Sequence, residues 1–461
     1  MLVQTHQQAI DPGQSDDDYN IAGRLERIPT SRWHVRVRLI VGTATFFDAF
    51  DMLALSSALP VLVKLWHLTH AQVGTLIASG FAGQILGAFA FGWLADRIGR
   101  VRALQYNIML FSLMALGCAL SPNYTTLLVC RVIQGVGIGG EVPIAASYIN
   151  ELTRAHKRGK FVLLYEIVFS IGVLLAGFIG AILVPRLGWQ SVFVLGCIPA
   201  VIALVMRRSL PESPRWLAGK GRFREADAVV TQIENYTLRA GLELPCAPRI
   251  PVVSVPRSRV SELLGAKYLR RTLSVWTLWF CVYFVTYGVI TWLPTIYVSV
   301  FHFDLQTALT VAAASSVVSV PMNFLLAFII DRIGRRRWFT IGLALGAVPL
   351  VAIWLLGTQN HMLVVVLAAL SYMFTGPSCS ACYLYTPELY PTRLRVVGSS
   401  VATVWLRIAS TIGPFAVGMI LTYSDYRSVF LMFAVVALIG SVVIGCFGEE
   451  TSERVLEDLS Q

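Results

Sequence analysis

The chain has 461 residues, of which 56% are hydrophobic and only 14% are charged, and its formal net charge is +11. A soluble domain carries about a quarter charged residues, so this composition excludes an ordinary soluble fold. Apolar runs of about 20 residues, the length that crosses a bilayer, recur along the whole chain. Because backbone amides in lipid have no other hydrogen-bond partners, each run is expected to be a helix.

The apolar runs form two groups of six, which predicts an all-α membrane protein with twelve transmembrane helices in two six-helix bundles. The expected spans are residues 39–63, 72–95, 103–121, 125–149, 161–184, 190–207, 272–299, 306–330, 338–357, 361–386, 396–422 and 428–447. The expected parts are an N-terminal arm at 1–38, a first bundle at 39–207, a linker at 208–269, a second bundle at 270–448 and a tail at 449–461.

The placement of lysine and arginine predicts the orientation. Of the 37 such residues, 32 lie in segments on the same side of the spans as both termini, and the opposite loops hold only Lys64, Arg186 and Arg427. The positive-inside rule therefore places the arm, the linker and the tail in the cytoplasm. This asymmetry accounts for the positive net charge without a nucleic-acid partner. No apolar segment precedes the first span, so no cleaved signal peptide is expected.

A basic segment precedes the first span, and eight cysteines are scattered along the chain. Arg24 and Arg27, with the arginines that follow them, look like a basic approach to the membrane surface. Among the eight cysteines, Cys379 and Cys382 form a C-x-x-C within an apolar run. There we expect packing rather than a redox or metal pair, and hence neither a metal nor a cofactor.

Two charged motifs occur twice at nearly the same offset. Residues 96–100, Asp-Arg-Ile-Gly-Arg, return 235 positions later as residues 331–335. Tyr148-x-x-Glu151-Leu152 returns 237 positions later as Tyr385-x-x-Glu388-Leu389. Two unrelated motifs that share an offset indicate a duplicated half-chain, as in transporters with internal repeats.

The charges in these motifs predict a gate at the cytoplasmic face. A carboxylate beside several guanidinium groups can hold two helices together and can also release them, whereas the alternative is positive-inside anchoring alone. Glu151 and Glu388 are placed to accept the arginines of the two repeated loops. The expected gate residues are Asp96, Arg97, Arg100, Glu151, Arg158, Asp331, Arg332, Arg335, Glu388 and Arg395.

The loop at residues 92–102, Gly-Trp-Leu-Ala-Asp-Arg-Ile-Gly-Arg-Val-Arg, resembles the signature of the major facilitator superfamily, and the resemblance covers the whole chain. The second copy starts with Ala327 in place of glycine. The string at residues 211–217, Pro-Glu-Ser-Pro-Arg-Trp-Leu, resembles a signature of sugar porters and their organic-ion relatives. We expect this string to lock the two halves together. The superfamily implies alternating access between the two bundles.

Ionisable residues within the spans are functional candidates, because burying a charge in lipid is costly. Asp48 and Asp51 lie on one helical face. In related proton-coupled sugar porters, an aspartate of helix 1 pairs with the helix-4 arginine that here is Arg131. This resemblance implies that Asp51 and Arg131 couple transport to protons, since burial and a mobile arginine push the aspartate pKa in opposite directions. A static salt bridge is the alternative.

Three further acidic residues accompany this pair. The string Asp48-Ala-Phe-Asp51 resembles the D-G-F-D of aromatic acid–proton symporters, so Asp48 either shares the proton or only seats the helix. Glu141 and Glu166 could relay the proton towards the cytoplasm or attract a cation. Glu166 also stands where sugar porters carry a sugar-binding glutamine, which argues against a sugar.

Arg407 is the residue most indicative of substrate charge. Its surroundings in residues 399–414 resemble helix 11 of organic anion transporters, whose arginine contacts the anion. A guanidinium at mid-membrane needs a counter-charge, and the second half has no acidic residue within its spans. A carboxylate substrate would supply that charge. The alternatives are satisfaction by water or carbonyl groups, or pairing with Asp48 or Glu141.

Aromatic residues near these charges could form the wall of a pocket for a flat ring, although a membrane tryptophan or tyrosine more often packs. The expected substrate-binding residues, besides Arg407, are Phe47, Tyr283, Tyr287, Trp292, Tyr372, Tyr383 and Trp405.

Together these patterns predict a monomeric, multi-pass protein of the bacterial inner membrane. The closest resemblance is to bacterial niacin and aromatic-acid metabolite–proton symporters, relatives of synaptic vesicle glycoprotein-like proteins and organic ion transporters. It implies proton-coupled uptake of a small organic anion, such as nicotinate or a benzoate-type acid. The alternatives are an organic cation or amine carrier, a sugar porter and a uniporter. An integral-membrane enzyme or a receptor is disfavoured. The expected partners are the substrate, protons and lipid.

Overall fold

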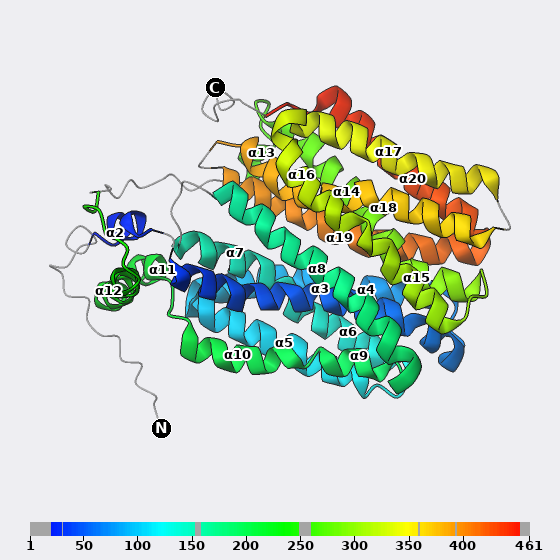
Figure 1. Cartoon of the computed structure of the whole chain (residues 1–461), viewed down its shortest axis with the longest axis horizontal. Coiled ribbons are helices and arrows are strands. Elements are labelled where there is room, and N and C mark those ends of the chain that lie inside the picture. The colour runs from blue at the N-terminus through cyan, green and yellow to red at the C-terminus, as the bar shows by residue number, and fades with distance from the viewer. Residues whose placement is uncertain are drawn as a thin grey trace.

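The computed structural model describes residues 20–29, 31–152, 158–248, 260–357, 360–391 and 394–451, without the side chains of 158–167, 205, 207, 208 and 396. Every element in these ranges is a helix (Figure 1). Within these described ranges, eleven helices are long and apolar enough to cross a bilayer, which confirms the predicted fold class.

The helices of the first bundle lie below those of the second in Figure 1. The first bundle consists of α3 (Arg32–Trp66), α4 (His70–Ile98), α5 (Arg100–Ala119), α6 (Tyr124–Gly139), α7 (Glu141–Leu152), α8 (Arg158–Leu187), α9 (Gln190–Leu195) and α10 (Ile198–Ser209). The second consists of α14 (Leu269–Ser299), α15 (Leu305–Val317), α16 (Ser319–Ile333), α17 (Arg335–Leu356), α18 (His361–Glu388), α19 (Arg395–Tyr423) and α20 (Tyr426–Phe447).

The predicted span at 190–207 is not one helix. It breaks after Gly196, and α10 begins with Pro199 in its first turn. Proline has no amide hydrogen and its ring clashes with the preceding turn, so a continuous helix is disfavoured here. Both pieces pack on α5 and together fill the place of a sixth helix. The fourth membrane span (α6 and α7) and the eighth (α15 and α16) break in the same way, shortly before Pro143 and Pro321.

The first membrane helix starts earlier than predicted. It begins at Arg32, so the last residues of the expected arm are already helical. The side chains of Ser31 and His34 bond to each other at 3.1 Å where the helix begins. A pattern of apolar residues does not indicate this start, because the first turns of the helix contain several polar residues.

Two ends of the molecule can be distinguished. The loop end carries the turns at Gly99 and Gly334, and the far end is opposite. Towards the far end the bundles touch: the hydroxyl of Ser56 in α3 donates to the carbonyl of Thr291 in α14 at 2.8 Å. α4 and α19 also approach closely, because a Cβ on Gly74 would lie 2.8 Å from a backbone oxygen of α19.

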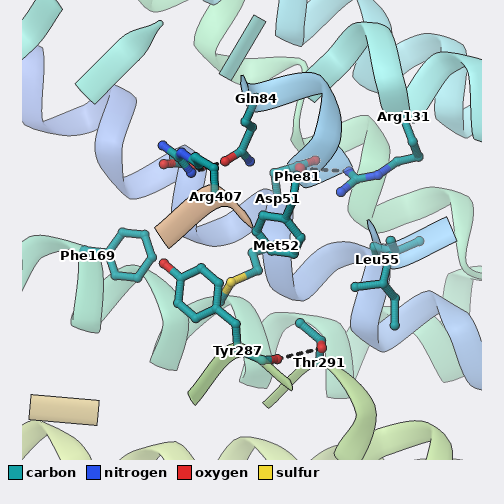
Figure 2. Close-up of a pocket in the computed structure, with 12 residues that line it drawn as sticks. Asp51, Met52, Leu55, Phe81, Gln84, Arg131, Phe169, Tyr287, Thr291 and Arg407 are labelled. Carbon is teal, nitrogen blue, oxygen red and sulfur yellow. Dashed lines mark hydrogen bonds and ion pairs between the residues drawn. The ribbon is translucent and has the colours of Figure 1, made fainter. Parts of the chain in front are cut away.

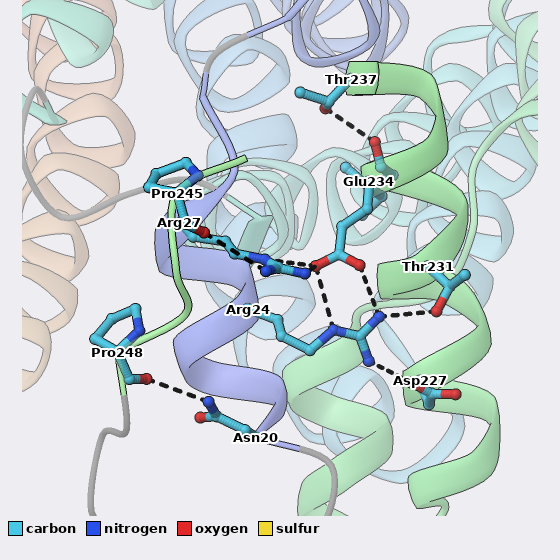
Figure 3. A network of polar contacts seen from close by, with 10 residues as sticks. Asn20, Arg24, Arg27, Asp227, Thr231, Glu234, Thr237, Pro245 and Pro248 are labelled. Atoms are coloured by element: carbon cyan, nitrogen blue, oxygen red, sulfur yellow. Dashed lines mark hydrogen bonds and ion pairs between the residues drawn. The ribbon is translucent and has the colours of Figure 1, made fainter. Parts of the chain in front are cut away.

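Three short helices gather at the loop end: α2 (Ile21–Arg27), α11 (Pro214–Gly219) and α12 (Phe223–Arg239) (Figure 1). Figure 3 shows how Arg24 and Arg27 of α2 reach Glu234 of α12, each at 2.8 Å. Arg24 also bonds to Asp227. We call this set of four residues the clamp. The expectation that these arginines approach the membrane surface was wrong, because acidic side chains of the linker hold them.

Apolar packing beside the clamp also holds α2 against α12, and the ion pairs of the clamp shift the pKa values of its members. Leu25 of α2 is buried in the same cluster as Ile233 of α12. Burial acts to raise the pKa of Glu234, but the hydrogen bonds from Arg24 and Arg27 outweigh it, so the pKa lies below its ordinary value of 4.5. The hydrogen bond to Glu234 raises the pKa of Arg24. The clamp is therefore ionised at neutral pH.

Glu234→Gln should release α2 from α12. Because charge-assisted bonds are lost, amide exchange of Ile21–Arg27 is expected to become roughly tenfold faster in hydrogen-exchange mass spectrometry. Glu225→Gln, which removes an exposed charge from the same helix, is the matched control. Amide exchange is itself catalysed by base, so each rate is divided by the intrinsic rate at the same pH to give a protection factor. Since the pKa of Glu234 is lowered, the protection of Ile21–Arg27 in the parent protein should stay constant between about pH 5 and 8 and fall only in stronger acid. Equal exchange in both variants would contradict the clamp.

Candidate functional site

A polar cavity lies between the bundles, and Figure 2 shows its lining. Residues of both bundles contribute, from α3, α4, α6, α8, α14 and α19. A second cavity adjoins it, with an empty volume of about 720 Å³ including solvent continuous with it. The two cavities share Asp48, Met52, Phe169, Tyr287 and Arg407. They therefore form one candidate site, which we call the central cavity.

The structure brings Asp51 and Arg131 together at 2.7 Å. Gln134 completes a closed triad: its amide nitrogen donates to the other oxygen of Asp51 at 2.7 Å, and its oxygen accepts from Arg131 at 2.8 Å. All three side chains are buried. Sequence reasoning missed Gln134, although its position one turn after Arg131 on an apolar helix was a signal.

Arg407 reaches the cavity from α19 and donates to the side-chain oxygen of Gln84 in α4, beside which Figure 2 places it. This contact joins the two bundles. Among the described residues no ion pair links Arg407 to a carboxylate. Asp48 lines the same cavity and interacts with Arg407 electrostatically. Gln84 was also missed, because nothing in a single sequence indicates which polar residue an arginine meets across the interface.

Glu141 does not belong to the lining of either cavity. Glu141 is 1% exposed, begins α7 where helix four breaks, and accepts a hydrogen bond from Thr45 at 2.8 Å. The positive end of the α7 dipole favours a carboxylate at that position. Thr45 itself lines the central cavity. Glu166 was predicted to act with Glu141, but its side chain lies outside the described residues.

The aromatic wall is only partly as predicted. Tyr283, Tyr287, Tyr372 and Tyr383 line the central cavity, and so does Phe169, which sequence reasoning missed.

Three other predicted aromatic residues are not in the lining of either cavity. Trp292 is fully buried and donates to the carbonyl of Pro414 at 3.0 Å, so it packs α14 against α19. The ring of Trp405 lies 5.5 Å from that of Trp276. Phe47 packs on Phe50 of its own helix. Each of the three side chains therefore packs against neighbouring rings or helices.

The repeated motifs form the same ionic arrangement in both bundles. Arg100 pairs with Asp96 at 2.6 Å and with Glu151 at 3.1 Å. Arg335 pairs with Asp331 at 2.7 Å and with Glu388 at 3.0 Å. These pairs join helices of one bundle rather than the two bundles.

Of the remaining predicted gate residues, those with described side chains take no part in these pairs. Arg97 is exposed and lies 3.9 Å from the ring centre of Trp93. Arg332 is exposed, and Arg395 begins α19. The side chain of Arg158 lies outside the described residues.

The string at residues 211–217 does not lock the halves together as expected, because it binds within the first bundle. Glu212 accepts from the backbone amides of Arg100 and Val101 at 2.8 and 3.2 Å. Tyr148 donates to the carbonyl of Pro211 at 2.6 Å. A carboxylate at the start of α5 satisfies amides that have no partner within the helix.

The second bundle repeats this cap, which sequence reasoning missed. Glu450 accepts from the amides of Arg335 and Arg336 at 2.8 and 3.2 Å, and Tyr385 donates to the carbonyl of Glu449 at 2.7 Å. The turn residue must be glycine in both copies. Gly334, like its counterpart in the first bundle, has a positive φ, and a Cβ there would lie 2.4 Å from the carboxylate.

Two six-helix bundles with repeated loops, closed around a polar cavity at mid-depth, define a transporter of the major facilitator class. Residues 38–461 match the family model for sugar (and other) transporters, and the chain belongs to this family. It is accordingly a multi-pass integral membrane protein.

Two curated bacterial relatives are similar over nearly their whole length. The niacin transporter NiaP of Acinetobacter baylyi is 32% identical over 444 residues, covering 95% of this chain and 99% of the relative. The putative niacin/nicotinamide transporter NiaP of Bacillus subtilis is 28% identical, covering 91% and 96%. The crystal structure of a D-xylose–proton symporter has a TM-score of 0.73 at 19% identity, covering 91% of this chain and 99% of that one, which shows the fold.

Proposed function

We propose that this transporter takes up a small aromatic carboxylate, such as nicotinate or a benzoate-type acid, together with protons. The observation that carries the proposal is the environment of Arg407. Its guanidinium lies in the cavity with a neutral hydrogen-bond partner, Gln84, so its charge is left for an anion. The two niacin-related relatives support the same class of substrate.

The cavity lining suits such a ligand. A guanidinium can present two parallel N–H donors to a carboxylate, and the bond to Gln84 would be exchanged for them. Tyr283, Tyr287 and Tyr383 supply flat surfaces for the ring. These groups would orient the carboxylate towards α19 and the ring towards α14 and α18.

Proton coupling follows from the carboxylates near Arg407. A bound anion and the carboxylate of Asp48 would repel each other in the same low-dielectric cavity, and a proton on Asp48 relieves the repulsion. Arg131 and Gln134 hold Asp51 in the present arrangement, and we propose that Asp51 takes up the coupled proton when Arg131 moves away. Substrate and proton would thus enter together and leave together.

The positive-inside rule would place the loop end in the cytoplasm, in the inner membrane of a bacterial cell. The bundle contacts towards the far end support an inward-facing state of the carrier. The two repeated loops would approach each other when the carrier opens outward, with Glu151 and Glu388 holding each loop in shape. This is the gate that the sequence predicts.

The alternative of an organic cation carrier rested on the excess of acidic residues within the spans. This excess is smaller in the cavity lining, because Glu141 lies outside it and Asp51 is paired with Arg131 there. A sugar is the other alternative. Sugars require many hydrogen-bonding groups, whereas aromatic rings dominate one side of this cavity. Both alternatives remain outcomes of the binding test below.

Arg407→Ala should weaken nicotinate binding roughly 10- to 100-fold, because a charge-assisted pair is lost. Arg407→Lys keeps the positive charge but not the planar guanidinium, and its affinity for nicotinate should lie between those of the parent and Arg407→Ala. The measurement is the thermal shift of the purified protein over a ligand titration, with Arg239→Ala, which changes an exposed arginine at the end of α12, as the control variant. Nicotinamide, which has the same shape without the charge, should not stabilise the protein. Stabilisation by amines or sugars alone would overturn the proposal.

Asp48→Asn and Asp51→Asn should each abolish accumulation of nicotinate in proteoliposomes with a proton gradient, while exchange of labelled for unlabelled substrate persists. Accumulation by both variants at the parent level would show that neither aspartate carries the coupled proton, whereas a parent protein that equilibrates nicotinate without accumulating it would be a uniporter. If only one variant loses accumulation, that aspartate alone carries the coupled proton.

Glu151→Gln or Glu388→Gln should favour the state that is open at the loop end, because each removes an ionic partner of a loop arginine. A cysteine placed at Thr286, in the central cavity, reports this opening. Its labelling by an impermeant thiol reagent from the loop-end side is expected to become several-fold faster. Glu225→Gln is the control, and unchanged labelling would count against the gate.

A further inference from the structure

Besides the contact of Ser56 with Thr291, the described residues form two polar side-chain contacts between the bundles, one on each side of the central cavity. On one side α4 packs against α19, and Arg407 bonds to Gln84. On the other side α8 packs against α15 and α16, and Asn323 of α16 donates to Ser170 of α8 at 3.5 Å. α3 and α14 lie between these two seams. The first contact belongs to the proposed anion site, and the second has no assigned role.

Hydrogen bonds fix the side chain of Asn323 in the wall of the central cavity. It is 7% exposed, and its side chain lines the central cavity with Arg407. Its oxygen accepts from Ser380 of α18 at 3.1 Å, and its nitrogen donates to the carbonyl of Ser319 at 3.2 Å. These two bonds orient the amide. Its remaining N–H is directed to Ser170 over 3.5 Å, at the outer limit of a hydrogen bond.

A long, weak bond at the cavity wall is one that a ligand can replace. An acceptor atom at the normal distance of about 2.9 Å would satisfy the second N–H of Asn323 better than Ser170 does. The cavity would then offer a guanidinium at one seam and an oriented amide donor at the other. Tyr283 and Tyr287 line the space between α3 and α14 that separates them.

We propose that Asn323 is a second recognition residue, which donates a hydrogen bond to an acceptor on the ring of the carboxylate substrate. The class of ligand is an aromatic acid with a ring nitrogen or an oxygen substituent away from the carboxylate. The nitrogen of pyridine-3-carboxylate meets this description, whereas benzoate has no such acceptor. This inference rests on the proposed function, because it takes the carboxylate to lie at Arg407.

The proposal also connects binding with movement. Arg407 and Asn323 both belong to the second bundle, and their present partners, Gln84 and Ser170, both belong to the first. A ligand held by the former pair would replace both cross-bundle contacts. Loading would therefore loosen the second bundle from the first at mid-depth, and the ligand would act on the conformational equilibrium through these two bonds.

The test compares nicotinate and benzoate, which differ by one ring atom, on the purified full-length protein. Binding is measured by calorimetry for the parent, for Asn323→Leu, which keeps the volume and removes the donor, and for Ser380→Ala, which removes the orienting bond. Ser378→Ala is the control for Ser380, because Ser378 is buried on the same helix and bonds only to its own helix backbone.

The parent is expected to prefer nicotinate by about tenfold, since benzoate would leave the amide donor of Asn323 without an acceptor of normal length. Asn323→Leu should bind both acids equally, with benzoate affinity unchanged, and Ser380→Ala should reduce the preference in part. Retained benzoate binding shows that the variant is folded.

Two results would overturn the inference and leave the proposed function intact: equal affinity of the parent for both acids, or a preference that survives in Asn323→Leu. If the parent binds neither acid, the proposed function fails and the inference fails with it.

Discussion

A charge inside a membrane needs compensation, and the organisation of this transporter depends on how it compensates two arginines. Arg131 is held by Asp51 and Gln134 in a closed, buried triad of short bonds. Arg407 has the neutral amide of Gln84 instead. One guanidinium therefore forms an ion pair within the protein, whereas the other has a neutral hydrogen-bond partner, with Asp48 nearby in the same cavity. The proposed function assigns proton coupling to the first site and anion binding to the second because of this difference.

The duplicated motifs form equivalent contacts in the two bundles. Both bundles place a carboxylate, Glu212 or Glu450, over the first amides of the helix that follows a glycine turn. The acid satisfies backbone donors, and the turn brings an arginine within reach of Glu151 or Glu388. The charged residues that line the cavity do not repeat in this way. The two halves thus share a scaffold and differ in their function.

Sequence reasoning succeeded where a property is local. Most helix ends lie within a few residues of the predicted ones, because the apolar runs are long and end at charged or turn-forming residues. It failed where distant segments meet. Arg24 appeared to face a membrane surface because Glu234 is 210 positions away in the chain. Trp292 looked like a pocket residue because the sequence does not show which helix face packs against α19.

Hydropathy and the repeated motifs predicted the class of fold, the membrane-spanning segments and the charged residues that lie within or beside them. Each of these properties depends on the residues of one segment and their contact with lipid or water. The tertiary structure alone decided the partners of those charges. Gln84 and Asn323 carry no charge and belong to no motif, and each matters only because packing brings it to a seam between the bundles. A hydrogen bond depends on distance in space, which the order of residues along a chain leaves open until the helices pack.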